Sequence, residues 1–415
     1  MKANVVHMDL NPCGGAEQVA IATIQALVDL DIDVDLTLAK RPDIPKLVKV
    51  FGQERIGQVF NRIGKINPLG SLMDTDHSHQ DYDITVNTHG DMLPYYHPSS
   101  SSSRSNTITY CHYPVAAEFI LQHDRAYLER LADLRLVHGA HPSDAKAGIW
   151  HELLNKYIKM LKNSLVITNS SFSKKAILKV LSSDAPAKAE YPIIIPPPVS
   201  VEEYRAAALY SSERTDSILA ISRIHPTKKL ENAIMLASLL KKEGIGDGMI
   251  IAGNLLHYDR YSHEYYQHIM RMIDTYKVSD YVRLEVNVPL ERLKSLMRRS
   301  KVYFHPMPGE PFGISTAEAM SAGLIPVVPD TGGHTDFVPK QYQFGSIHEA
   351  VGIISRALHA PHEDRIRISD SVIRFSHSNY VKQFQAVIKE LNIGAEVRTP
   401  SVSKNVLKGR RSIAA

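Results

Sequence analysis

The sequence has few cysteines and no long hydrophobic run, and each shortage excludes a class of protein. Among 415 residues only Cys13 and Cys111 are cysteines. They cannot build a disulfide framework or a cysteine-based zinc site, and we expect a protein of the reducing cytoplasm. No stretch reaches the roughly 18 apolar residues typical of a transmembrane helix. The first residues combine charge and an early proline, which argues against a secretory signal peptide.

Net charge is also absent from the body of the protein. The net charge is +4, and residues 396–415 alone contain five lysine or arginine side chains against one glutamate. The rest of the chain is therefore neutral overall, which argues against a nucleic-acid-binding surface. Residues 396–415 show no apolar periodicity, and we interpret them as a flexible basic tail.

What the sequence does have is a regular alternation of strand-like and helix-like segments. Hydrophobic residues make up 44% and charged residues 22%, a normal globular balance, and the length predicts two or three domains. Asn4–Asp9, Ala16–Leu30 and Asp33–Ala39 read as strand, helix and strand. This order is typical of a parallel sheet and predicts an α/β fold. Further strand-like runs lie at 81–88, 106–113, 164–170, 217–222, 248–253, 281–286, 301–306 and 325–330.

Three consecutive prolines, Pro196–Pro198, separate two such series of strands. They cannot continue a helix or a central strand, so we place a domain boundary there. The sequence thus predicts two Rossmann-like domains, 1–198 and 199–378, which face each other across a cleft. Ligands of such sheets bind at the carboxyl ends of the strands.

Two motifs at predicted strand ends suit a phosphate. Gly14-Gly15 opens the first helix, where free N–H groups and close backbone approach favour an anion, although a simple tight turn is an equal interpretation. The pair is not GxGxxG, which argues against a nicotinamide dehydrogenase. Arg223 and Lys228 follow the strand 217–222 and precede a helix. Two cations there suit a diphosphate, although a solvated basic loop is the commoner outcome.

The strongest motif is His305-Pro-Met-Pro-Gly-Glu310-Pro-Phe-Gly-Ile-Ser-Thr-Ala-Glu318. A strand ends in a proline- and glycine-containing loop with Glu310, and Glu318 lies in the opening turns of the next helix. Two carboxylates eight residues apart are able to reach two hydroxyl-bearing parts of one ligand. The N–H groups between them remain for a phosphate. This pattern is more specific than a solvated loop followed by an acidic first helical turn.

Together these motifs resemble the group 1, retaining glycosyltransferases of the GT-B fold. The resemblance rests on GGAE (14–17), Arg223 with Lys228, Glu310-x7-Glu318, TGGHTDFV (331–338) and ITNSSFSKK (167–175), in the family's order over most of residues 1–390. It implies a helix at 379–395 that crosses back onto the first domain. The motif YCHYP and the glycine-rich start are similar to mannosyltransferases that extend lipid-linked oligosaccharides.

The resemblance also implies roles for individual residues. Glu310 would bind hydroxyls of the donor sugar, and Glu318 would hold the ribose. Arg223 and Lys228 would neutralise the diphosphate, while backbone groups of Gly15 and of Phe312, Gly313 and Ile314 would contact the donor. His112, in YCHYP, would line the catalytic centre together with Glu310. Three departures from the family pattern are Lys229 and Asn287, which stand where glycine is common, and Asp336, which stands where glutamate is usual.

Other polar residues support weaker hypotheses. Asp74–Asp81 contains an Asp-x-Asp similar to metal sites, but it precedes a strand and reads as a solvated loop, so we expect no metal and no cofactor. His7, His138 and His141 are expected to be structural or exposed, whereas His89 is as well placed to contact an acceptor as to be structural. The five-residue serine run 99–103 is interpreted as a loop.

Lys46–Ile66 reads as one basic amphipathic helix. Most such helices pack on a core, but this one also suits an anionic membrane surface, so we expect a cytoplasmic protein with a possible place at the inner face of the membrane.

The sequence therefore predicts a metal-independent retaining glycosyltransferase. Its expected partners are a GDP- or UDP-linked sugar donor and a glycan or polyprenyl-linked acceptor. Two alternatives stay open: a nucleotide-sugar 2-epimerase of the same architecture, and a non-catalytic nucleotide-sugar-binding subunit. The complete donor motif favours transfer over both.

Overall fold

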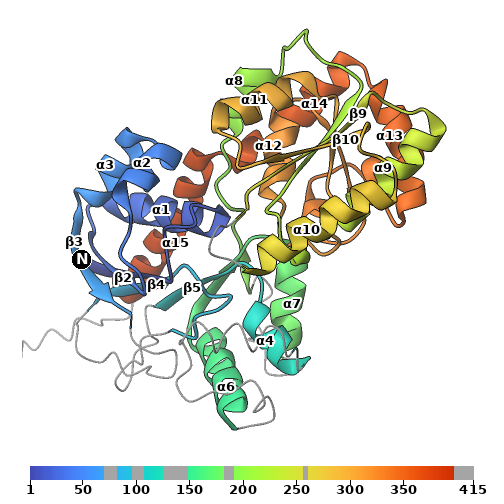
Figure 1. The fold of residues 1–415 in the computed structure, drawn as a ribbon. Helices are drawn as coiled ribbons and strands as arrows, with labels where there is room; N and C mark the ends of the chain where they lie inside the picture. Colours follow the sequence, from blue (N-terminus) through green and yellow to red (C-terminus); the bar gives the residue numbers. More distant parts are fainter. Residues whose placement is uncertain are drawn as a thin grey trace, which may run out of the picture.

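The computed structural model describes residues 1–69, 82–95, 107–122, 124, 148–181, 191–255 and 260–396. Within these ranges the chain forms two lobes, each built on a parallel sheet (Figure 1). The strand order is β3-β2-β1-β4-β5-β6-β7 in the first sheet and β10-β9-β8-β11-β12-β13 in the second. This confirms the predicted α/β fold with two parallel-sheet domains.

The first lobe alternates strands and helices from the first residues onward. Its elements are β1 (Lys2–His7), α1 (Gly15–Val28), β2 (Asp33–Leu38), α2 (Ile44–Phe51), α3 (Gln53–Phe60), β3 (Ile63–Pro68), β4 (Ile84–Asn87), β5 (Thr107–Cys111), α4 (Val115–Leu121), α6 (Gly148–Asn163), β6 (Leu165–Thr168), α7 (Ser171–Leu181) and β7 (Ile193–Ile194). Every residue of β4 and β5 is buried, as expected for strands of a parallel sheet that is covered on both faces.

The second lobe repeats the same alternation. Its strands are β8 (Ser217–Ile221), β9 (Gly248–Gly253), β10 (Val282–Val286), β11 (Val302–Phe304), β12 (Ile325–Pro329) and β13 (Gln343–Phe344). Its helices are α8 (Val201–Ala208), α9 (Glu231–Glu243), α10 (Arg260–Thr275), α11 (Leu290–Arg299), α12 (Ile314–Ser321), α13 (Ile347–Leu358) and α14 (His362–Ser371). Short 3-10 helices are η3 (Pro226–Lys228), η4 (Gly333–Asp336), η5 (Lys340–Tyr342) and η6 (Ile373–Phe375).

The last helix, α15 (His377–Glu396), lies beside α1 in the first lobe (Figure 1). Tyr380, Phe384 and Ile388 are buried in the hydrophobic core of that lobe. The hydroxyl groups of Tyr380 and Thr23 are hydrogen-bonded at 2.7 Å. The last described helix therefore packs on the first domain, although the residues before it belong to the second. The domain limits themselves, at 198/199 and 378/379, stay predictions.

The two passages between the lobes run side by side. The N–H of Val199 donates to the carbonyl of Phe375 at 2.8 Å, and Val199 and Ser376 form a parallel bridge. The two crossing segments are thus hydrogen-bonded to each other where the lobes join.

The predicted single helix over Lys46–Ile66 is wrong. Gly52, with φ 88°, ends α2 and begins α3, and the chain then enters β3. Ile63 and Ile66 pair with Val34 and Leu36 of β2, so they belong to the sheet and not to a helical face. The prediction failed because the apolar residues keep a helical spacing across the change from a helical to an extended backbone.

Candidate functional site

Three loops meet at the carboxyl edge of the second sheet. β8 lies between β9 and β11, and β12 follows β11 in the strand order. η3 follows β8, residues 305–313 follow β11, and η4 follows β12. Because parallel strands end at the same edge, these loops are neighbours, at the place where the strand order reverses and ligands of α/β sheets bind.

Lys228 and Glu310 form an ion pair at this edge. Nζ of Lys228 lies 2.6 Å from Oε2 of Glu310, and the side chains are only 18% and 14% exposed. Nε2 of the buried His305 lies 3.4 Å from the same oxygen. Burial by itself would raise the pKa of Glu310, but Lys228 and His305 outweigh it and hold that pKa well below its ordinary value. The carboxylate is therefore ionised and suited to accept hydrogen bonds from hydroxyl groups.

The backbone around Glu310 is held by close contacts with the loop after β12. Gly333 donates its N–H to the carbonyl of Glu310 at 2.7 Å. A Cβ on Gly333 would lie 1.9 Å from the carbonyl oxygen of Pro311, so only glycine fits there. Gly313 precedes α12 with φ 98°, a left-handed conformation that glycine adopts without strain. These contacts fix the carboxylate relative to the start of α12.

Glu318 lies within α12 and is half-buried. Burial, and to a smaller extent the charge of Glu203 on α8, raises the pKa of Glu318 to about 8. Thr316, two residues nearer the start of α12, is fully buried and its hydroxyl has no hydrogen-bond partner among the described residues. The two carboxylates of the Glu-x7-Glu motif thus lie in electrostatically opposite surroundings.

The other residues predicted to contact the donor take different positions. The side chain of Arg223 is exposed, and no described residue pairs with its guanidinium. The ring of Phe312 is buried against Phe337 and Phe375, with ring centroids 5.1 and 5.2 Å away, which leaves backbone groups of this loop for a ligand. Gly15 meets Ile314 across the domain boundary, since a Cβ on Gly15 would lie 2.4 Å from Cδ1 of Ile314.

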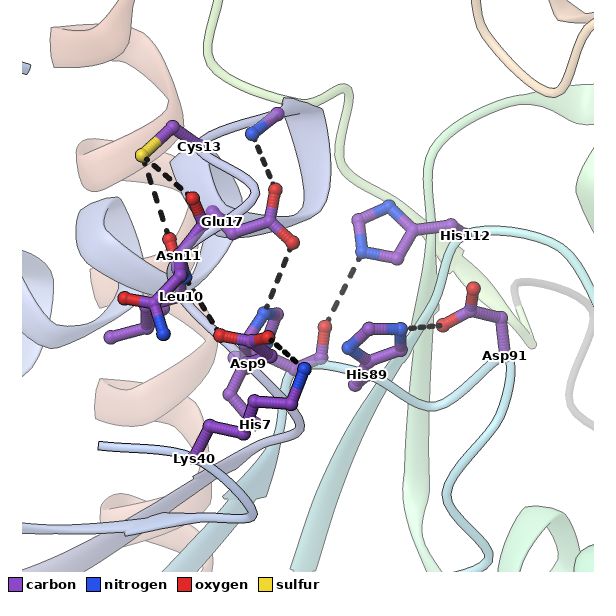
Figure 2. A network of polar contacts seen from close by, with 12 residues as sticks. His7, Asp9, Leu10, Asn11, Cys13, Glu17, Lys40, His89, Asp91 and His112 are labelled. Atoms are coloured by element: carbon purple, nitrogen blue, oxygen red, sulfur yellow. Dashed lines mark hydrogen bonds and ion pairs between the residues drawn. The ribbon is translucent and has the colours of Figure 1, made fainter. Parts of the chain in front are cut away.

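The carboxyl edge of the first sheet carries histidines (Figure 2). His7 ends β1, is fully buried, and lies 3.6 Å from Glu17 of α1 through its Nε2. The ring centroids of His7 and His89 are 4.7 Å apart, and Nε2 of His89 lies 3.8 Å from Asp91. Burial lowers the pKa of His89 to about 3, with the nearby His7 adding to the effect. His89 is therefore neutral at physiological pH.

His112 lies at the end of β5 and joins the same group of side chains (Figure 2). Its Nε2 lies 3.3 Å from the carbonyl oxygen of Thr88, and burial lowers the pKa of His112. The oxygen Oδ1 of Asp91 and the nitrogen Nδ1 of His89 are buried, without a hydrogen-bond partner among the described residues. This edge is therefore polar but weakly charged, which suits an uncharged hydroxylated molecule better than a phosphate.

A cavity of about 650 Å³ lies outside both edges, between α1, α3 and α15. It contains none of the predicted site residues. Among the described residues no three His, Cys, Asp or Glu side chains are grouped for a metal ion. Asp74–Asp81, the serine run, His138 and His141 lie outside the described residues.

Residues 204–372 match the family model described as glycosyl transferases group 1. The matched segment contains every residue of the second-sheet edge described above. This segment of the chain is therefore similar to the group 1 glycosyltransferases.

Curated relatives agree with this match, and solved structures share the fold. The chain is 25% identical over 214 residues to the GDP-Man:Man(3)GlcNAc(2)-PP-Dol alpha-1,2-mannosyltransferase of Dictyostelium discoideum, covering 48% of this chain and 42% of that one. For the enzyme of the same name from Neurospora crassa the identity is 24%, covering 67% and 55%. The chain thus spans about half the length of these relatives. Sucrose-phosphate synthase from Thermosynechococcus elongatus shares the fold, with a TM-score of 0.65, 15% identity and 95% and 100% coverage.

Two departures of the chain from the group 1 motifs have a common explanation. Lys229 and Asn287 stand where glycine is common, and both adopt positive φ, 50° and 52°. Asn287 adds a side-chain contact, because its Oδ1 accepts the N–H of Leu255 at 2.8 Å. The backbone shape is therefore kept at both positions without glycine.

Sequence reasoning missed His305, His334 and Glu17. His305 touches Glu310, and its position at the end of a strand was a usable signal. His334 is fully buried, and burial lowers its pKa to about 4, with His305 nearby as a further cause. Glu17 was visible in GGAE, but its contact with His7 joins residues of different elements and is not visible in a motif.

A search for long apolar helices in the described residues finds none that would span a membrane.

Proposed function

We propose that the protein transfers a sugar, with retention of anomeric configuration, from a nucleotide-diphosphate sugar to a hydroxyl group of a glycan acceptor. The observation that carries the proposal is the Lys228–Glu310 pair at the edge of the second sheet, beside the start of α12. It combines a cation for phosphate with an ionised carboxylate for sugar hydroxyls. Arg223 adds a second cation whose guanidinium is available in the described structure.

In the proposed reaction the bond between the anomeric carbon and the β-phosphate oxygen breaks, and a bond to the acceptor oxygen forms on the same face. The acceptor's proton passes to the leaving phosphate oxygen. Lys228, Arg223 and the start of α12 stabilise the negative charge that develops on the diphosphate, without a metal ion. Glu310 holds the sugar, Glu318 accepts hydrogen bonds from the ribose, and His112 lines the centre from the first domain.

The curated relatives suggest the substrates. Their printed name gives GDP-mannose as donor and a dolichol-linked oligosaccharide as acceptor. We propose the same donor class here, with a polyprenyl-linked glycan as acceptor. The weakly charged edge with His89, Asp91 and His112 supports an acceptor site for neutral sugar hydroxyls.

We also propose contact with the inner face of a membrane. α2 exposes Lys46, Lys49 and Val50, the last 46% exposed, which combines basic charge with an apolar side chain. Flotation with vesicles tests this contact: binding to anionic vesicles that is lost in a Lys46→Glu/Lys49→Glu variant supports it. Equal binding to neutral vesicles would contradict the electrostatic part.

The transfer reaction is tested with GDP-mannose, UDP-glucose and UDP-N-acetylglucosamine. Each is incubated with a synthetic lipid-linked Man(3)GlcNAc(2), and products are analysed by mass spectrometry and NMR. We expect an α-linked mannosyl product from GDP-mannose, with turnover that persists in EDTA.

Inverted configuration would contradict retention, and EDTA-sensitive turnover restored by Mn²⁺ would contradict metal independence. A 2-epimer of the donor, or binding without turnover, would contradict transfer. Glu363→Gln serves as the control, because it changes an exposed carboxylate of α14 that belongs to none of the motifs named above.

A further inference from the structure

The start of α7, in the first domain, lies against two loops of the second domain. The N–H of Ser171 donates to Oδ2 of Asp336 at 2.7 Å, and the hydroxyl of Ser171 donates to Oδ1 of the same carboxylate. Asp336 belongs to η4, so 165 residues separate the partners in sequence. Figure 1 shows α7 directly below the second lobe.

The same helical turn contacts the loop of Glu310. The hydroxyl of Ser170 donates to the carbonyl of Pro311, the residue after Glu310, at 2.5 Å. The fully buried hydroxyl of Ser173 donates to the carbonyl of His112 at 2.7 Å and lies 3.5 Å from the carbonyl of Pro311. One helical turn thus touches both segments that carry the proposed catalytic residues, His112 and Glu310.

The chemistry of a helix start explains why these contacts hold. The first N–H groups of a helix have no partner within it and carry positive potential. In α7 the N–H of Ser173 is capped locally by the hydroxyl of Ser170 at 3.1 Å, but the N–H of Ser171 is capped by Asp336 of the other domain. A carboxylate that caps a helix of another domain ties the two domains together.

Ring contacts beside this turn add to the join. Phe172 stacks on Tyr113, the residue after His112, with ring centroids 5.6 Å apart and planes at 13°. A Cβ on Gly309 would lie 3.6 Å from Cζ of Phe172, which is ordinary contact distance. Phe172 therefore approaches both the segment after β5 and the loop before Glu310.

We infer that Ser170, Ser171, Ser173 and Asp336 form an interdomain latch that sets His112 and Glu310 in register for the reaction. Asp336 is a positioning residue that acts through α7. This role explains how an aspartate functions at a position where the family usually has glutamate. The inference rests on the proposed function, because the register matters only if a sugar is transferred between the two domains.

The test compares Asp336→Ala, Ser171→Ala and their double variant with the matched control Glu363→Gln. Hydrogen exchange followed by mass spectrometry reports on peptides covering 170–174 and 309–314. We expect Asp336→Ala to speed exchange in the first-domain peptide 170–174 several-fold, although the substitution is in the second domain. We expect kcat for transfer to fall about fivefold, while the Kd of GDP alone stays unchanged. The double variant should be little worse than Asp336→Ala.

The outcomes separate the contact, the positioning role and the function. Unchanged exchange at 170–174 in Asp336→Ala would overturn the latch. Faster exchange with wild-type kcat would show a structural contact and overturn the positioning role. A loss of GDP affinity equal to the loss of kcat would place Asp336 in the donor site instead. If the wild-type protein transfers no sugar from any tested donor, the proposed function fails with the positioning role, and the exchange result alone decides the contact.

Discussion

The carboxyl edges of the two sheets are built on the same plan but differ in charge. The second edge holds an ionised carboxylate, Glu310, paired with Lys228. Arg223, which pairs with no described residue, follows β8 in the same set of loops. The first edge holds neutral His89 and His112, with Glu17 and Asp91 among them. One fold thus provides a charged edge and a weakly charged edge, which we propose bind a diphosphate and hydroxyl groups, respectively. The difference lies in the residues that follow each strand, not in the strands.

The family model follows the same division. It covers residues 204–372, which contain the charged edge, and leaves the histidine edge outside. Under the proposed function, the family pattern marks the donor side and not the acceptor side. Diphosphates are chemically alike among donors, whereas acceptors differ, so an acceptor-binding first domain would have less reason to keep a recognisable pattern.

The largest expected effect comes from removing α15, because this truncation should destabilise the domain that carries the histidine edge and not the domain that carries the charged edge. A chain ending at residue 379 loses Tyr380, Phe384 and Ile388 from the core of the first domain only. Loss of even one large buried side chain costs about 3–5 kcal/mol, so this truncation should unfold the first domain. A chain ending at residue 396 keeps α15 and should melt like the full protein. Calorimetry of the three chains decides this, and equal melting of both truncations would contradict the assignment of α15 to the first core.

The next largest effect should come from removing one cation of the charged edge. Lys228→Ala deletes the partner of Glu310 and, as proposed, of the diphosphate. Loss of a charged hydrogen-bond partner of this kind costs about 2–4 kcal/mol of transition-state stabilisation, and Arg223→Ala should act in the same direction. Steady-state kinetics should show reduced donor use with little change in KM for the acceptor.

Lys229→Ala is the matched control for Lys228→Ala, because it removes the same charge from the adjacent, exposed residue. We expect it to retain donor use. Equal losses in both variants would mean that the edge acts through its overall potential and not through a specific contact.

A His89→Gln variant completes the comparison, since it should impair acceptor use and leave GDP binding intact.

The sequence predicted much of the charged edge and less of the histidine edge. Strand ends and motif spacing placed Lys228, Glu310 and Glu318 on neighbouring loops, because a parallel sheet brings its carboxyl ends together. They did not reveal the contact of Glu17 with His7 or that of Asp336 with Ser171, which join distant parts of the chain. The predicted helix over Lys46–Ile66 failed because Gly52 turns the chain and β2 offers a pairing partner to Ile63.

The two carboxylates of the charged edge should respond differently to pH. The pKa of Glu318 is raised to about 8, above its ordinary value of 4.5, so the folded protein holds a proton there that the unfolded chain releases. The stabilising effect of this proton is complete below pH 4.5 and is lost as the pH rises towards 8. If ribose hydroxyls donate to the Glu318 carboxylate, ionisation favours binding, and GDP should bind more tightly as the pH rises from 6 to 8.

Calorimetric titration with GDP over this pH range tests the difference. Glu318→Gln should flatten the pH dependence and weaken GDP binding about tenfold at pH 8. Glu310→Gln should keep the pH dependence, because the pKa of Glu310 is held well below this range, and should lower kcat/KM for the sugar nucleotide only. If Glu310→Gln weakens GDP as severely as Glu318→Gln, the division between sugar and ribose contacts is wrong.

The smallest expected effect concerns the backbone that supports the charged edge. Lys229 adopts φ 50° and ψ 44°, a left-handed conformation that costs an ordinary residue about 1 kcal/mol relative to glycine. Glycine gains flexibility in the unfolded chain, which offsets part of this difference. Lys229→Gly should therefore raise the free energy of unfolding by at most about 1 kcal/mol and leave GDP binding unchanged. Lys277→Gly, at φ 54° two residues beyond the end of α10, is the control and should show the same gain. Chemical denaturation measures both. A gain at position 277 with a loss at position 229 would mean that the Lys229 side chain, and not only its backbone, stabilises the edge, and the charged surface would then extend one residue beyond the Lys228–Glu310 pair.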